Sequence, residues 1–154
     1  MKCQEANNLL LGIDSMIRDI KASSQPPTIQ SYLAKYLIVA VSSAYQESLK
    51  QIILQYTSNV STNELHSFVG GTLERTPNPS AKYVKETIKN FSPKWHRALL
   101  RLKIDRFNDM DSINSLRNSI AHGTQVPVTL NDAVKYYKSS KKIIEKVDLL
   151  LLGR

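Results

Sequence analysis

The stretch from Ile29 to Val60 constrains the fold most, because it is long and contains neither Gly nor Pro. Its apolar residues recur every three or four positions, as they do on one face of an α-helix. They are Leu33, Tyr36, Leu37, Ala40, Val41, Ala44, Leu49, Ile52, Ile53 and Tyr56. With Thr28 as its N-cap, the stretch predicts one continuous helix of about 45 Å at 1.5 Å per residue. Such a helix is long enough to form the spine of the domain.

Helical periodicity also dominates the rest of the chain, and no stretch shows a convincing β-strand pattern. Before and just after the spine, helices are predicted at 4–22 and at 61–69, the second stopped by Gly70–Gly71. A turn at 76–79 is followed by a helix to about Asn90 and by another at 93–104. A further helix is capped by Asp111 or Ser112 and ends at His122, and a last helix begins at 129–132. The predicted fold is therefore all-α. We expect an up-and-down helical bundle with short additional helices, in a single domain of residues 1–154.

Charge and hydropathy narrow the classes of partner. Lys and Arg outnumber Asp and Glu by 21 to 13, and the net charge of +8 favours a polyanion, with RNA, DNA and anionic membrane all open. The basic residues within 93–104 favour a solvated helix face over a specific RNA contact. The longest apolar run, Tyr36–Val41, is far shorter than the roughly 20 residues of a membrane-spanning helix. No signal-peptide pattern is present, so we expect a cytoplasmic protein with no membrane partner.

The sequence offers little for a metal site. Cys3 is the single cysteine, and His66, His96 and His122 are too scattered for zinc-type spacing. We therefore expect no bound metal and no cofactor. His66 and His96 are interpreted as packing or surface residues.

The eight residues Leu116–Gly123, L-R-N-S-I-A-H-G, concentrate side chains of catalytic type. An Arg supplies a permanent forked cation, a His titrates near neutral pH, and an Asn both donates and accepts, which suits the handling of a phosphodiester. Gly123 is placed to close the helix in a left-handed C-cap just beyond His122. Asn118 and His122 are four residues apart and share a helix face, whereas Arg117 is turned away by roughly 140°. A composite site made with a two-fold mate would resolve this offset, so the spacing hints at a dimer.

The R-N-S-I-A-H-G stretch resembles the motif of the HEPN superfamily, in which an Arg followed by a polar residue is separated from a His by four to six positions. Here Arg117 and His122 enclose four residues, Asn118 is the polar neighbour, and the last long helix comes soon after. Tyr45–Lys50, Y-Q-E-S-L-K, also looks like a helix of the HEPN branch called RiboL-PSP. The resemblance implies an α-helical bundle that dimerises with its two motifs facing each other. It also implies a metal-independent endoribonuclease that acts as a toxin or host-defence effector.

The same resemblance implies site residues and partners. The catalytic candidates are Arg117, Asn118 and His122, and Glu47 is a supporting candidate. The implied partners are an RNA substrate, a second copy of the chain, and an antitoxin or sensor protein that restrains the activity. In some HEPN toxins a Tyr two residues after the His is the target of modification. This chain has Thr124 there, which argues against regulation by tyrosine modification at that position.

In the expected mechanism, His122 takes the proton of an RNA 2′-hydroxyl, which attacks the adjacent phosphorus, while Arg117 holds the phosphoryl oxygens. Asn118 would orient His122 or the phosphate. Each residue also has a structural explanation, because a His is favoured near a helix C-terminus, an Arg can pair with a carboxylate, an Asn can lie on the surface, and Glu47 could pair with Lys50. For the whole domain, the alternatives are a non-catalytic HEPN-like module that binds RNA or a protein, and a plain helical interaction domain.

Overall fold

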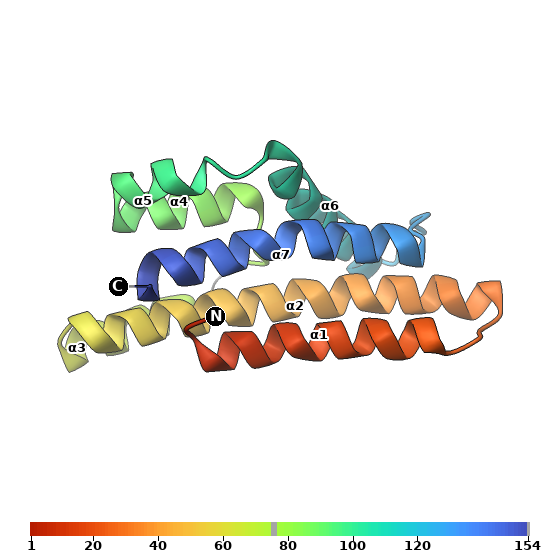
Figure 1. The fold of residues 1–154 in the computed structure, drawn as a ribbon, viewed down its shortest axis with the longest axis horizontal. Helices are drawn as coiled ribbons and strands as arrows, with labels where there is room; N and C mark the ends of the chain where they lie inside the picture. The colour runs from red at the N-terminus through yellow and green to blue at the C-terminus, as the bar shows by residue number, and fades with distance from the viewer. Residues whose placement is uncertain (75–76, 154) are drawn as a thin grey trace.

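The computed structural model describes residues 1–74 and 77–153, and it confirms the all-α prediction. The described residues form helices joined by short connections, and no strand occurs among them. In chain order the helices are α1 (Gln4–Ala22), α2 (Pro27–Val60), α3 (Asn63–Leu73), α4 (Ala81–Phe91), α5 (Pro93–Leu99), α6 (Ile104–Ala121) and α7 (Leu130–Leu152), as Figure 1 shows.

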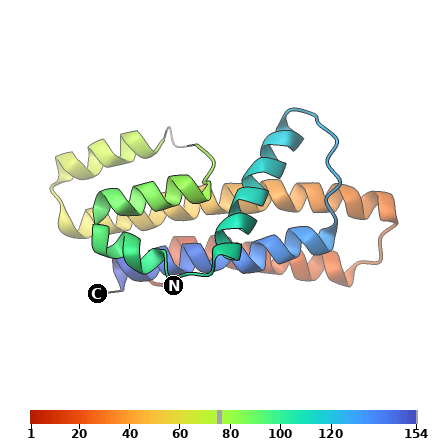
Figure 2. The same cartoon turned by 90° about the horizontal axis from the view of Figure 1, so that it is seen from above.

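Three long helices, α1, α2 and α7, lie side by side and carry most of the core (Figure 1). The spine predicted from the sequence is α2, which packs against α1, α3, α6 and α7. The short helices α4 and α5 pack on each other and contact α6 and α7, respectively. Helix α6 crosses α2 and α7 at a steep angle, and its C-terminal end stands away from the bundle (Figure 2). The fold therefore carries the end of α6, with the candidate motif, out from the packed helices.

Two tyrosines join the three long helices through polar contacts inside the core. The hydroxyl of Tyr45, on α2, donates to the carbonyl of Tyr137 at 3.0 Å and lies 2.8 Å from the hydroxyl of Ser140, both on α7. The hydroxyl of Tyr137 is in turn 2.9 Å from both the Leu10 carbonyl oxygen and Asp14 Oδ1 on α1. Burial raises the pKa of both tyrosines, so their hydroxyls stay protonated and donate. These contacts fix how α1, α2 and α7 align along their lengths.

The predicted ends of the long helices are confirmed with one exception. Helix α1 covers the predicted range, α2 ends at Val60, and Thr129 caps α7 in a capping box with Asp132. Thr28 does not cap α2, because the helix already begins at Pro27. Proline suits the first helical position, where its missing N–H would have no intrahelical partner.

The predicted stop of α3 at Gly70–Gly71 is wrong. The helix begins after Thr62, whose side chain accepts from the Leu65 N–H, and it continues through both glycines to Leu73. A glycine costs a helix only about 1 kcal/mol, which packing against α2 can offset. Thr76, the first residue of the predicted turn that follows, lies outside the described residues.

The predicted helix at 93–104 is also wrong in its extent. Helix α5 ends at Leu99, and α6 begins at Ile104 and not near Asp111. The buried stripe of α6 starts at Phe107, so burial of apolar side chains sets the start of this helix. Asp105, Asp109 and Asp111 therefore lie on the first turns of α6.

Candidate functional site

The candidate motif occupies the last two turns of α6, and its end is fixed by backbone geometry. Gly123 has a left-handed φ of 73°, and its N–H donates to the carbonyl of Ile120 at 3.1 Å. The N–H of Thr124 donates to the carbonyl of Ser119 at 2.9 Å, which completes a Schellman motif. His122 is the C-cap residue and is exposed. The predicted left-handed cap beyond His122 is therefore confirmed.

Arg117 is half-buried and is held by a residue that the sequence analysis did not identify. With the Asn78 amide turned so that its oxygen faces Arg117, Nη1 and Nε of the guanidinium donate to that oxygen at 3.2 and 3.1 Å. In the same orientation, the Asn78 amide nitrogen donates to Gln46 Oε1 on α2 at 3.3 Å. The partner of Arg117 is thus an amide and not a carboxylate. A neutral acceptor leaves the full positive charge available, and a guanidinium with five N–H donors keeps others for a ligand.

Asn118 and His122 lie on the exposed part of α6. Their backbones are joined, because the His122 N–H donates to the Asn118 carbonyl at 3.1 Å. Among the described residues, no hydrogen bond joins the side chains of Arg117, Asn118 and His122. One chain therefore presents the three groups together on one helix end but does not assemble them into a connected set.

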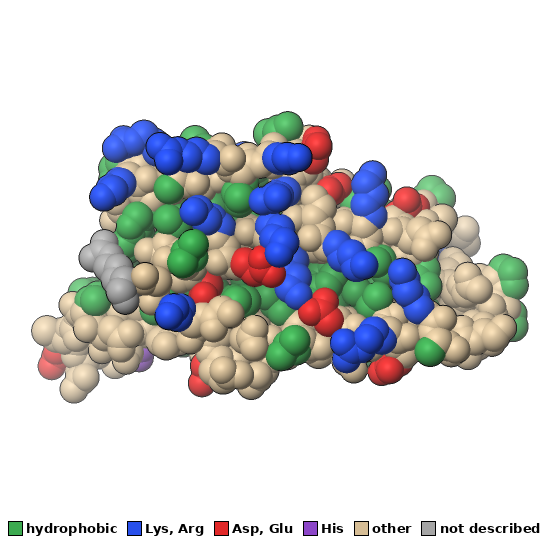
Figure 3. All heavy atoms as spheres, in the orientation of Figure 1, with side chains coloured by type: hydrophobic (Ala, Val, Ile, Leu, Met, Phe, Trp, Pro, Cys, Tyr) green, Lys and Arg blue, Asp and Glu red, His purple; other side chains and the backbone are tan. Residues whose placement is uncertain are grey.

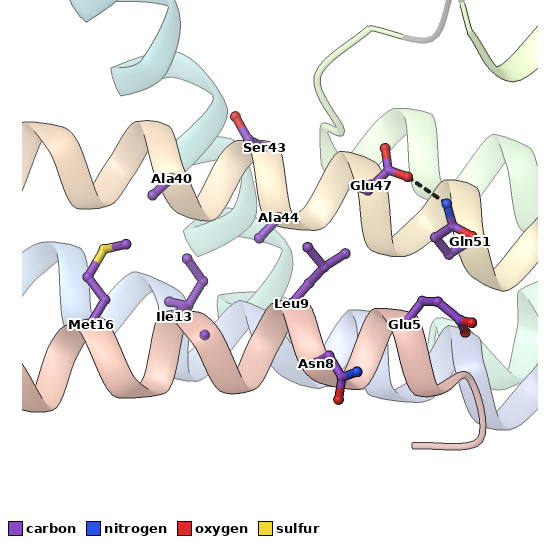
Figure 4. Close-up of a pocket in the computed structure, with 11 residues that line it drawn as sticks. Glu5, Asn8, Leu9, Ile13, Met16, Ala40, Ser43, Ala44, Glu47 and Gln51 are labelled. Carbon is purple, nitrogen blue, oxygen red and sulfur yellow. Dashed lines mark hydrogen bonds between the residues drawn. The ribbon is translucent and has the colours of Figure 1, made fainter.

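Glu47 lies elsewhere, beside a groove of about 730 Å³ between α1 and α2 (Figure 4). Its Oε1 accepts from Gln51 Nε2 at 2.6 Å. Lys50, the partner considered for it above, forms its salt bridge with Glu74 at 2.5 Å. Gln46, the preceding residue, is the one that reaches the Asn78 and Arg117 pair. Within the described part of one chain, the structure does not join Glu47 to Arg117, Asn118 or His122.

Comparison with known families decides where this arrangement belongs. The family model described as RiboL-PSP-HEPN matches residues 2–153, which is almost the whole chain. The chain belongs to the RiboL-PSP-HEPN family. No curated protein and no solved structure matches it significantly. Membership of this HEPN family supports an RNA-related role for the domain.

No helix in the described ranges is long and apolar enough to cross a membrane. Within the same ranges, no three His, Cys, Asp or Glu side chains gather as a group that could hold a metal ion.

Proposed function

We propose that this HEPN domain is a metal-independent endoribonuclease of the cytoplasm, which acts as a toxin or host-defence effector. Arg117, Asn118 and His122 carry the reaction. The observation that supports this most is the placement of the R-N-S-I-A-H stretch: Arg117 is held by a neutral amide, and His122 is exposed at a capped helix end.

The proposed reaction is an internal transesterification of RNA. His122 takes the proton of a 2′-hydroxyl, and the 2′-oxygen then attacks the adjacent phosphorus. The bond from phosphorus to the 5′-oxygen of the next nucleotide breaks as the new bond forms. Arg117 donates to the phosphoryl oxygens, whose negative charge grows in the transition state. The products carry a 2′,3′-cyclic phosphate and a 5′-hydroxyl, and DNA resists cleavage because it has no 2′-hydroxyl.

The leaving 5′-oxygen needs a proton, and a second copy of the chain supplies it in this proposal. Arg117 and His122 are five residues apart and so face different sides of α6. The end of α6 is exposed at Asn118 and His122, where the motif of a partner could lie against it. Two opposed copies would then provide one His122 as base and the other as acid. Asn118 orients one of these imidazoles or the phosphate. An antitoxin or sensor protein that covers this exposed end would restrain the activity.

The test is cleavage of mixed RNA by purified protein in the presence of EDTA. Wild-type protein should cut, whereas His122→Ala should lower the rate by about 10²–10⁴-fold and Arg117→Ala by about 10²–10³-fold. Matched controls are His96→Ala, which alters a half-exposed histidine on α5, and Arg18→Ala, which alters an exposed arginine on α1. Both controls should cut like wild type, and thermal unfolding should show all four variants folded.

A second function is favoured by one observation, namely that the three side chains are not joined within one chain. A non-catalytic HEPN module would bind RNA or a protein through the same surface. RNA binding without cleavage by wild type and by both motif variants would favour that module. Cleavage by His122→Ala at the wild-type rate would exclude the proposed mechanism.

Expression of wild-type protein should arrest growth, and either motif substitution should relieve the arrest.

A further inference from the structure

The positive charge of the chain is concentrated around α4 and α5. Residues 77–104 contain seven Lys or Arg and one Glu, so this stretch carries +6 of the net charge of +8. Figure 3 shows Lys and Arg side chains gathered over α4 and α5. The exposed cations of the stretch are Lys82, Lys89, Lys94, Arg97, Arg101 and Lys103. Clustered positive charge attracts a polyanion more strongly than the same charge spread evenly over the surface.

An uncharged groove of about 770 Å³ lies between α3 and α4, and one of its walls is the helix that also carries Lys82 and Lys89. Phe68, Tyr83 and Phe91 line it with aromatic rings, Asn90 and Thr87 add polar groups, and none of its described lining residues is charged. The Phe91 ring is fixed edge-on against Tyr56, with 5.6 Å between centroids. Phe68 is 71% exposed, so packing in the core does not account for it.

We propose that the groove between α3 and α4 is a binding site for unpaired bases of single-stranded RNA, separate from the Arg117 and His122 site. This proposal rests on the proposed function, because the groove would anchor the RNA substrate of that reaction. Bases taken out of a helix stack on exposed aromatic rings, and cations beside the rings bind the phosphates. Phe68 offers such a ring, and Lys82 and Lys89 lie on α4, which forms one wall of the groove. The Asn90 amide can donate to and accept from a base edge.

The chain itself links this groove to the candidate catalytic site. Pro77 lines the groove, and the next residue, Asn78, is the one that holds Arg117. RNA anchored between α3 and α4 would therefore leave the groove at the loop that supports the phosphate-binding arginine. An unpaired strand suits this path, because its bases are free to turn into the groove.

Another groove of the described structure, between α1 and α2, shows why RNA should select the groove between α3 and α4. It is similar in volume, at about 730 Å³, but its charged lining residues are both acidic, namely Glu5 and Glu47. Carboxylates repel phosphates, and that groove offers no aromatic ring among its described lining residues. Charge and aromatic content thus distinguish two grooves of nearly equal size.

The experiment measures binding of a short fluorescein-labelled 2′-O-methyl RNA by anisotropy, as a single strand and annealed to its complement. Phe68→Ala should weaken binding of the single strand roughly tenfold, because one stacking contact is lost. Phe68→Trp, which keeps an aromatic ring, should bind like wild type. The matched control is Leu65→Ala, which removes another exposed apolar side chain of α3 outside the groove and should change affinity by less than about twofold. Binding of the duplex should not change in any of these variants.

A cation of the same surface gives an independent measure. Lys89→Ala should reduce the slope of log affinity against log salt by about 0.7, whereas Lys21→Ala, at the end of α1, should leave it unchanged. Wild-type affinity in Phe68→Ala, or an equal loss for the duplex, would overturn the proposal. The probe has no free 2′-hydroxyl and so resists cleavage, which separates its binding from the catalytic step. Cleavage by His122→Ala would therefore defeat the proposed function while leaving this result intact.

Discussion

The first half of α6 is built into the core, whereas its last two turns project from the bundle. Phe107, Met110 and Ile113 are buried, and no later residue of α6 is. The first half of α6 also contacts α4, because Asp111 Oδ1 accepts a hydrogen bond from the Ala81 N–H, at the start of α4, at 2.8 Å. The last turns are held by a C-cap and by Asn78. Packing therefore dictates the residues of the first half more strongly than those of the motif, in which Leu116 and Ile120 pack partly buried against the core while Asn118 and His122 are exposed.

The largest effect on stability should follow a change in the first half. Met110 is fully buried, so Met110→Ala should lower the free energy of unfolding by about 2–5 kcal/mol. Ser115→Ala, at an exposed position of the same helix, should change it by less than about 0.5 kcal/mol. Urea unfolding of both variants gives the measurement. Similar stabilities for the two would show that the first half of α6 does not anchor it.

A smaller effect should come from the cap that ends α6. Gly123→Ala forces an L-residue to a φ of 73°, which should cost about 1–2 kcal/mol. The control is Gly12→Ala on α1, where an added Cβ meets no atom within 4 Å and helix propensity improves by about 1 kcal/mol. The midpoint temperature of thermal unfolding should thus fall for Gly123→Ala and rise for Gly12→Ala. A shift in the same direction would mean that the cap does not constrain His122.

The smallest change in stability should come from Asn78→Ala, which frees Arg117 without opening the core. We expect the free energy of unfolding to fall by about 1 kcal/mol, as for one ordinary hydrogen-bonding group. RNA cleavage should nevertheless fall about tenfold, because a misplaced group loses its advantage of position. Asn59→Ala, at an exposed position near the end of α2, serves as the control. Unchanged cleavage in Asn78→Ala would show that Arg117 needs no support from the loop.

The sequence predicted the features of the site that are local along the chain. The long spine, the cap at Gly123 and the start of α7 at Thr129 all follow from spacing and capping residues within a few positions. The position of His122 at a helix end was predictable for the same reason.

The remaining features depend on contacts between distant segments. Asn78 holds Arg117 only because the loop before α4 lies against α6. The residues around Asn78 in the sequence, prolines on both sides, indicate a loop but not its contact with α6. Helix α3 continues through Gly70–Gly71 because it packs on α2, which local propensity cannot reveal. The roles of Arg117, Asn118, His122 and Glu47 stay predictions until cleavage is measured.

The residues just before α1 are tied to α7. The carboxylate of Asp148 accepts from the N–H groups of Lys2 and Cys3 at 2.6 and 2.7 Å. A nascent chain that has reached His122 already carries the whole motif, yet it has no α7 to pack against α2 and α6. Closure of the bundle must therefore wait until the last helix leaves the ribosome. The motif is thus synthesised before the helix that completes its scaffold.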